Sequence, residues 1–167
     1  MKQIKTQIKT ALLIILLPAL AGCVTPSKVA VDQPVGPDLA PPRVDLGKGR
    51  GRLLVYTATE VNDQVDAYYP THSSYAIYTT DGKLVRRVGN RSGSFYQDPV
   101  PVSLPQGTYK IKGRATNSGE VTVPVVIEEK KTTVVDLEGT NLPQRKPTGA
   151  GQWIRLPDGQ VIGMRVE

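Results

Sequence analysis

The sequence predicts an all-β protein: a small antiparallel sandwich that follows a signal peptide and a tether and precedes a C-terminal β-hairpin. Short runs rich in β-branched and aromatic residues recur between residues 53 and 137, and none of them shows a helical period. Turn residues separate the runs, and the Asp81-Gly82 pair between two of them is a strong hairpin signal. These observations indicate one small β domain with a single core.

The expected strands follow one another along the chain, with a bulge or turn between residues 62 and 72. They occupy residues 53–59, 75–78, 84–88, 102–104, 109–115, 120–127 and 132–137. Alternation assigns faces, because successive side chains of a strand point to opposite sides. Tyr109, Ile111, Gly113 and Ala115 share one face, Lys110, Lys112 and Arg114 share the other, and Val121, Val123, Val125 and Ile127 share a face of the next strand.

The amino terminus has the three-part layout of a secretory signal. Lys2, Lys5 and Lys9 form a basic start without acids, and a mostly apolar run follows over residues 11–21. This run is too short to span a bilayer, which takes about 20 apolar residues. We therefore expect residues 1–22 to be a signal peptide rather than a transmembrane anchor.

The run Leu20-Ala21-Gly22-Cys23 resembles the lipobox of bacterial lipoproteins, and Cys23 is the sole cysteine of the sequence. The resemblance implies cleavage before Cys23 by signal peptidase II, a lipid on its thiol and usually an acyl chain, such as palmitate, on the new amino group. Several acyl chains hold a protein firmly to a membrane. With its one thiol blocked the chain can form no disulfide, so packing must supply the stability.

Residues 24–51 contain five prolines and no aromatic residue. Because proline removes a backbone donor and favours extended conformations, we expect a tether that neither pairs in a sheet nor continues a helix. Without residues 1–22 the chain carries 18 basic and 15 acidic residues, a formal net charge of +3 instead of +6. So small an excess, in an exported chain, argues against a nucleic-acid partner.

The last residues predict a linker and then a second hairpin, whose turn is Pro157-Asp158-Gly159. A lone hairpin is unstable, so we expect it to dock on the sandwich through Trp153, Ile154 and Ile162; the alternative is that it awaits a partner strand. The expected segments are 1–22 signal peptide, 23–51 lipidated cysteine and tether, 52–139 sandwich, 140–152 linker and 153–167 hairpin.

The stretch Leu104-Pro105-Gln106-Gly107-Thr108-Tyr109, together with residues 125–135, resembles the carboxypeptidase regulatory-like and transthyretin-like modules of exported bacterial proteins. The resemblance covers residues 53–139 and implies an Ig-like or transthyretin-like sandwich. It also implies an accessory or structural module, and it transfers no catalytic residue. In the turn itself, Pro105 presets the bend and Gly107 takes a backbone φ that other residues resist.

His72 is the single histidine, and it lies beside Ser73 and Ser74 and near Asp63 and Asp66. A serine hydrolase triad can be composed from these residues, but no nucleophile elbow or oxyanion-hole glycine pattern accompanies them. The two aspartates and the histidine match no calcium or zinc spacing. We expect a solvated turn histidine and no catalytic residue, metal or cofactor.

Two groups of side chains are candidates for partner binding. Tyr68, Tyr69, Phe95 and Tyr96 fall in apparent loops and could stack on a sugar ring or a peptide, whereas Tyr56, Tyr75 and Tyr109 are expected in the core. Lys110, Lys112 and Arg114 form a basic stripe, with Arg86, Arg87 and Arg91 elsewhere. The stripe could meet anionic lipid, lipopolysaccharide phosphate or an acidic protein, or could be a solvated outer face.

The sequence thus predicts a lipid-anchored envelope protein that acts as a non-catalytic binding or structural module. Its expected partners are the membrane and an envelope protein, glycan or anionic lipid. Val24 stands after the cysteine where enteric lipoproteins retained in the inner membrane have aspartate, so this resemblance favours the outer membrane facing the periplasm. The alternative is an envelope hydrolase or an inhibitor of an envelope enzyme.

Overall fold

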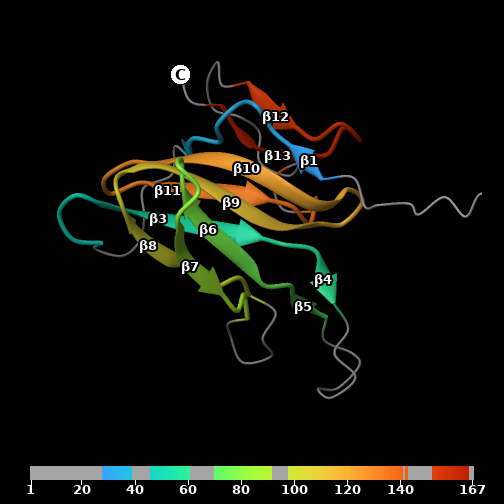
Figure 1. The fold of residues 1–167 in the computed structure, drawn as a ribbon, viewed down its shortest axis with the longest axis horizontal. Coiled ribbons are helices and arrows are strands. Elements are labelled where there is room, and N and C mark those ends of the chain that lie inside the picture. Colours follow the sequence, from blue (N-terminus) through green and yellow to red (C-terminus); the bar gives the residue numbers. More distant parts are fainter. Residues whose placement is uncertain are drawn as a thin grey trace, which may run out of the picture.

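The computed structural model describes residues 28–38, 46–60, 70–91, 98–140, 142 and 152–165, and their regular structure is entirely β (Figure 1). The strands are β1 Val29–Ala30, β2 Pro37–Asp38, β3 Arg50–Tyr56, β4 Thr59–Glu60, β5 Thr71–His72, β6 Tyr75–Thr79, β7 Leu84–Val88, β8 Val102–Pro105, β9 Gly107–Ala115, β10 Gly119–Ile127, β11 Thr132–Asp136, β12 Trp153–Arg155 and β13 Val161–Met164. The predicted all-β fold and C-terminal hairpin are confirmed.

Two sheets contain most of these strands. The five-stranded sheet has the order β1-β10-β9-β6-β7, and the four-stranded sheet has the order β2-β11-β3-β8. Most neighbours are antiparallel as expected, but β1 pairs with β10 and β3 pairs with β11 in parallel. Strands of such a pair lie far apart in the sequence, and no hairpin turn constrains their direction.

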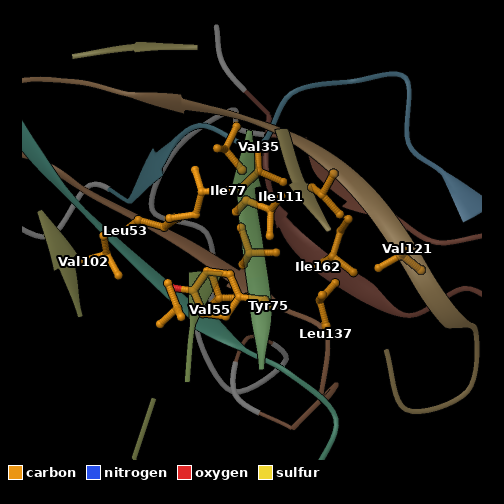
Figure 2. Close-up of a cluster of buried hydrophobic side chains, with 14 of the residues drawn as sticks. Val35, Leu53, Val55, Tyr75, Ile77, Val102, Ile111, Val121, Leu137 and Ile162 are labelled. Atoms are coloured by element: carbon orange, nitrogen blue, oxygen red, sulfur yellow. The ribbon is translucent and has the colours of Figure 1, made fainter. Parts of the chain in front are cut away.

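The hydrophobic core lies between the two larger sheets (Figure 2). Ile77 of β6 and Ile111 of β9 contribute from one sheet, and Leu53 and Val55 of β3 contribute from the other. All four side chains are fully buried. Each fully buried aliphatic side chain of this kind contributes about 1.5–3 kcal/mol relative to exposure, so this layer is the main source of stability.

The longest strands, β9 and β10, have the faces that alternation predicted. Ile111, Gly113 and Ala115 of β9 are buried, as are the predicted apolar residues of β10, whereas Lys110 and Lys112 are exposed. Tyr109 is half-buried and packs against the core. The inner faces of this pair therefore form one wall of the core, and its outer faces point to solvent.

Two predicted turns depend on glycine. Gly82 has φ 91° in the hairpin between β6 and β7, and Gly107 has φ 151° between β8 and β9. Residues other than glycine rarely adopt these backbone φ angles. In the first turn the Thr79 hydroxyl donates to the Asp81 carboxylate, and this bond holds the pKa of Asp81 below its ordinary value.

The predicted tether is wrong for residues 28–38, because this segment is part of both sheets. Val29 lies opposite Val121 at one edge of the five-stranded sheet, and Pro37 lies opposite Thr133 at one edge of the four-stranded sheet. Between them Val35 is fully buried; its N–H donates to the Pro124 carbonyl over 2.9 Å. The segment therefore crosses from sheet to sheet and closes one side of the sandwich.

The prolines permit this pairing because they lie at sheet edges. An edge strand needs only half of its backbone donors, so the missing N–H of Pro37 does not break a ladder. Val35 lies next to Pro34 and still exchanges two hydrogen bonds with β10, since its carbonyl accepts from the Val126 N–H over 2.9 Å. The number of prolines therefore does not decide whether this segment pairs in a sheet.

The C-terminal hairpin docks on the sandwich, as expected, and does not await a partner strand. Ile154 and Ile162 are buried in the common core, and Trp153 is half-buried. The Gly36 N–H donates to the Met164 carbonyl over 2.8 Å, so the hairpin is joined to the N-terminal segment. The expected bulge within residues 62–72 lies mostly outside the described residues, which resume at residue 70.

Candidate binding face

The outer face of the five-stranded sheet collects the predicted basic stripe. Lys110, Lys112 and Arg114 are all exposed on β9. The register places Lys112 opposite Ala76 of β6, and Ala76 is in turn opposite Arg87 of β7. Two cations from strands that are not neighbours thus flank one small residue.

The sequence did not place Arg87 with the stripe, because that requires knowing that β6 lies between β7 and β9. Arg86 precedes Arg87 on the same strand and lies opposite the inward-facing Ile77. Its charge acts on the buried Tyr75 phenol: burial raises the pKa of Tyr75 far above its ordinary value, and Arg86 partly offsets that increase. The two arginines therefore lie on opposite sides of the sheet.

Each cation of the stripe has one local contact. Arg114 Nη1 lies 2.8 Å from Glu60 Oε1, Lys112 Nζ lies 5.1 Å from the centre of the Tyr78 ring, and Lys110 Nζ donates to the Thr80 carbonyl over 2.8 Å. The side chains of Arg114 and Glu60 are 61% and 45% exposed, so their ion pair contributes less than about 1 kcal/mol. Such weakly held cations can turn toward an incoming anion at little cost.

A shallow depression of about 600 Å³ lies on this face. Its lining includes small residues, among them Ala76, Gly89 and Gly119, and the longer side chains of Arg87 and Lys112. The small residues leave room. Three cations and the Glu120 carboxylate line the depression, so the excess charge beside it is positive. We call this surface, defined by Ala76, Tyr78, Arg87, Lys112 and Arg114, the basic face.

The predicted loop aromatics Tyr68, Tyr69, Phe95 and Tyr96 lie outside the described residues. Of the three tyrosines expected in the core, Tyr75 is buried, whereas Tyr56 and Tyr109 are half-buried. Among the predicted binding residues that the structure describes, Lys112 and Arg114 therefore belong to the basic face, and Lys110 lies next to it on the same strand.

His72 is buried, so the expectation of a solvated turn histidine is wrong. Only 3% of the residue is exposed, because β5 pairs with β4 and the ring lies against Tyr56 at the end of β3. Its Nδ1 lies 2.7 Å from the Thr57 carbonyl oxygen, which can only accept, so Nδ1 carries the proton. The ring also meets Tyr56 edge-on, with 5.7 Å between the ring centres.

Buried polar groups surround this histidine. Thr57 Oγ1 donates to the Ser73 carbonyl over 2.6 Å. Asn90 is fully buried; its Nδ2 donates to the Val55 carbonyl over 2.8 Å, and its Oδ1 accepts from the Val100 N–H over 2.9 Å. Asn90 thus fixes the chain after β7 to β3, a role that the sequence, where Asn90 follows Gly89 as in a turn, did not reveal.

A pocket of about 250 Å³ lies beside His72, and its lining includes Tyr56, Asp98 and Glu138. Within the described residues no hydrogen bond joins the ring to Ser73 or Ser74: the Ser73 hydroxyl is buried without a partner, and Ser74 lines the depression on the basic face. Asp63 and Asp66 lie outside the described residues. The predicted alternative of a serine triad thus has no assembled nucleophile in the part described.

No group of three or more histidine, cysteine or acidic side chains in the described ranges is arranged to hold a metal ion. In the same residues no helix has the length and apolar character needed to cross a membrane.

Comparisons of the chain with protein families, with curated proteins and with solved structures find no match.

Proposed function

We propose that this chain is a membrane-anchored lipoprotein of the bacterial envelope whose β-sandwich is a non-catalytic binding module. The observation that carries the binding role is the basic face, where cations of β7 and β9 border one depression. A positive surface of this kind attracts anionic groups of a partner. The anchor is proposed from the sequence, in which Cys23 ends a lipobox.

The position of the basic face supports a surface role. Arg87, Lys112 and Arg114 are exposed, and their side chains do not contribute to the core. Lys112 and Arg114 of the face lie on β9, which pairs with β10 over nine residues in each strand. Binding there needs no rearrangement of the sandwich, which keeps the cost of ordering low.

The location that we propose is the outer membrane, with the sandwich in the periplasm. The described part of the chain begins at residue 28, five residues after Cys23. Five extended residues reach at most about 18 Å, so the sandwich would stay close to the lipid surface. Partners within reach are then envelope proteins, glycans or anionic lipid headgroups near that surface.

The proposal is tested in cells by cross-linking with formaldehyde before the lipoprotein is purified. Wild type is compared with Arg87→Glu/Lys112→Glu and with the control Lys28→Glu/Lys48→Glu, which changes the same charge at exposed positions away from the face. We expect a discrete adduct that the first variant loses and the control keeps. An adduct that survives in both variants would contradict the role of the basic face.

An envelope hydrolase or an enzyme inhibitor remains the second candidate, and the pocket beside His72 favours the hydrolase. Because Nδ1 donates to a carbonyl, Nε2 is the ring nitrogen with a lone pair, as a general base requires. His72→Asn keeps an amide donor at the position of Nδ1 but removes the base. Loss of the cellular phenotype of the lipoprotein in His72→Asn, with an unchanged unfolding midpoint, would favour the hydrolase and overturn the non-catalytic proposal.

A further inference from the structure

Within the described residues, one edge of the five-stranded sheet has no further strand beside it. The N-terminal segment covers the opposite side of the sandwich through β1 and β2, whereas β7 ends the sheet order at the other side (Figure 1). Among the described residues, β7 pairs only with β6. Every second residue of an antiparallel edge strand directs its N–H and carbonyl away from its neighbour, so β7 has backbone groups without a ladder partner among the described residues. The register of the pair shifts once, between Ile77 and Tyr78 of β6.

The open edge is also apolar in part. Leu84 and Val85 are 44% and 43% exposed, and they are the large hydrophobic side chains that the described residues expose most. Arg86 and Arg87 are exposed as well, and Val88 alone in the strand is buried. An exposed edge with aliphatic side chains is a template to which another extended segment can add.

Charge decides between two occupants of this edge. Lys83, Arg86, Arg87 and Arg91 lie in β7 or next to it. Two copies that paired antiparallel through their β7 strands, centred on Arg86, would place Arg86 opposite Arg86, and like charges in that position are destabilising. A segment with acidic side chains would instead face these cations with the opposite charge. The same residues therefore disfavour a second copy and favour an acidic strand.

We infer that the edge of β7 accepts an extended acidic segment of a partner protein as a sixth strand of this sheet. The inference rests on the proposed binding role and names the partner class. The added strand would lie about 4.8 Å from β7, and side chains of it would lie beside Leu84 and Arg87, which are opposite Tyr78 and Ala76 of the basic face. Backbone hydrogen bonds would supply affinity, and the arginines would select acidic sequences.

The test uses the mature chain, residues 23–167 with Cys23→Ser, and three synthetic peptides of equal length. The first alternates valine and glutamate, the second replaces glutamate by lysine, and the third is the acidic peptide with N-methyl groups on alternate residues. N-methylation blocks ladder bonds and leaves the charge unchanged. Affinity is measured by calorimetry, and protection of the Leu84–Val88 amides is measured by hydrogen exchange.

We expect the acidic peptide to bind and to slow exchange in β7, and the lysine and N-methyl peptides to bind at least tenfold more weakly. Arg86→Glu/Arg87→Glu should weaken the acidic peptide about tenfold, since each reversed charge turns an attraction into a repulsion. The control Lys28→Glu/Lys48→Glu should stay within about twofold. All four positions are exposed, so both variants should fold.

Three results would overturn the inference. Equal affinity for the acidic peptide and its N-methyl form, without protection of β7, would show surface attraction and no added strand. Protection of β7 in the free protein, with a dimer in sedimentation, would show a second copy there. Binding to vesicles of 30% phosphatidylglycerol but to no peptide would assign the cations to lipid. The first and third results leave the proposed binding module intact, so the two claims fail separately.

Discussion

Val35→Ala tests whether the N-terminal segment is part of the fold or a tether. Val35 is fully buried, and the substitution removes two methyl groups from contact with β10 and the C-terminal hairpin. The lost transfer energy is about 0.8 kcal/mol for each methyl group, roughly 1.6 kcal/mol in all. A cavity of about 40 Å³ adds about 1 kcal/mol at roughly 24 cal/mol per Å³. We expect a loss of about 2–3 kcal/mol.

The assay is urea unfolding of residues 23–167 with Cys23→Ser. With a slope near 1.5 kcal/mol per molar urea, the midpoint should fall by about 1.3–2 M. Trp153 is the sole tryptophan and lies in the hairpin that contacts Val35, so its fluorescence reports on docking. Circular dichroism reports on the sheets, and both signals should move together because the hairpin shares the core.

Val85→Ala is the matched control, because the same two methyl groups leave a side chain that is 43% exposed. Its cost should stay within about 0.5 kcal/mol. Equal midpoints for Val35→Ala and Val85→Ala would refute the reasoning, since a free tether predicts that the first substitution is as harmless as the second.

Three further predictions concern the interior. Asn90→Ala removes the side-chain partner of the partly buried Val100 N–H and of the buried Val55 carbonyl, and should cost about 2–4 kcal/mol in urea unfolding; a cost under 1 kcal/mol would contradict its bridging role. Gly51→Ala places Cβ 2.2 Å from the Glu128 carbonyl oxygen and should lower the free energy of unfolding by about 1–3 kcal/mol. Gly89→Ala, with open space around the added Cβ, is the control and should cost far less; equal costs in urea unfolding would contradict the close contact. Burial raises the pKa of Tyr75, so the stability that its neutral form provides is present below pH 10 and decreases as the pH rises above that value. Tyr75→Phe should reduce this loss of stability at alkaline pH. The same dependence of stability on pH in Tyr75→Phe and wild type would contradict the prediction.

The strands and their faces were predictable because they depend on local patterns. Alternation over residues 109–115 separates inward from outward side chains without knowledge of any neighbour. The turns were predictable for the same reason, since Gly82 and Gly107 are needed where φ is positive. The docked hairpin followed from the instability of an isolated pair of strands.

The contacts between distant segments were not predictable from local patterns. Residues 28–38 looked like a tether because proline lowers strand propensity, but an edge strand tolerates it. His72 looked solvated because its neighbours are polar, yet the Thr57 carbonyl satisfies its ring and the strand pairing buries it. Arg87 joined Lys112 through a strand order that no single segment encodes.

The central claim, a lipid-anchored module, is tested most directly by the intact mass of the protein extracted from bacterial membranes, with Cys23→Ala as the control. We predict a chain that begins at Cys23 and carries the added mass of acyl chains, and an uncleaved, unacylated Cys23→Ala chain. A wild-type chain without acyl mass, or one cleaved at another position with a free thiol, would contradict the claim.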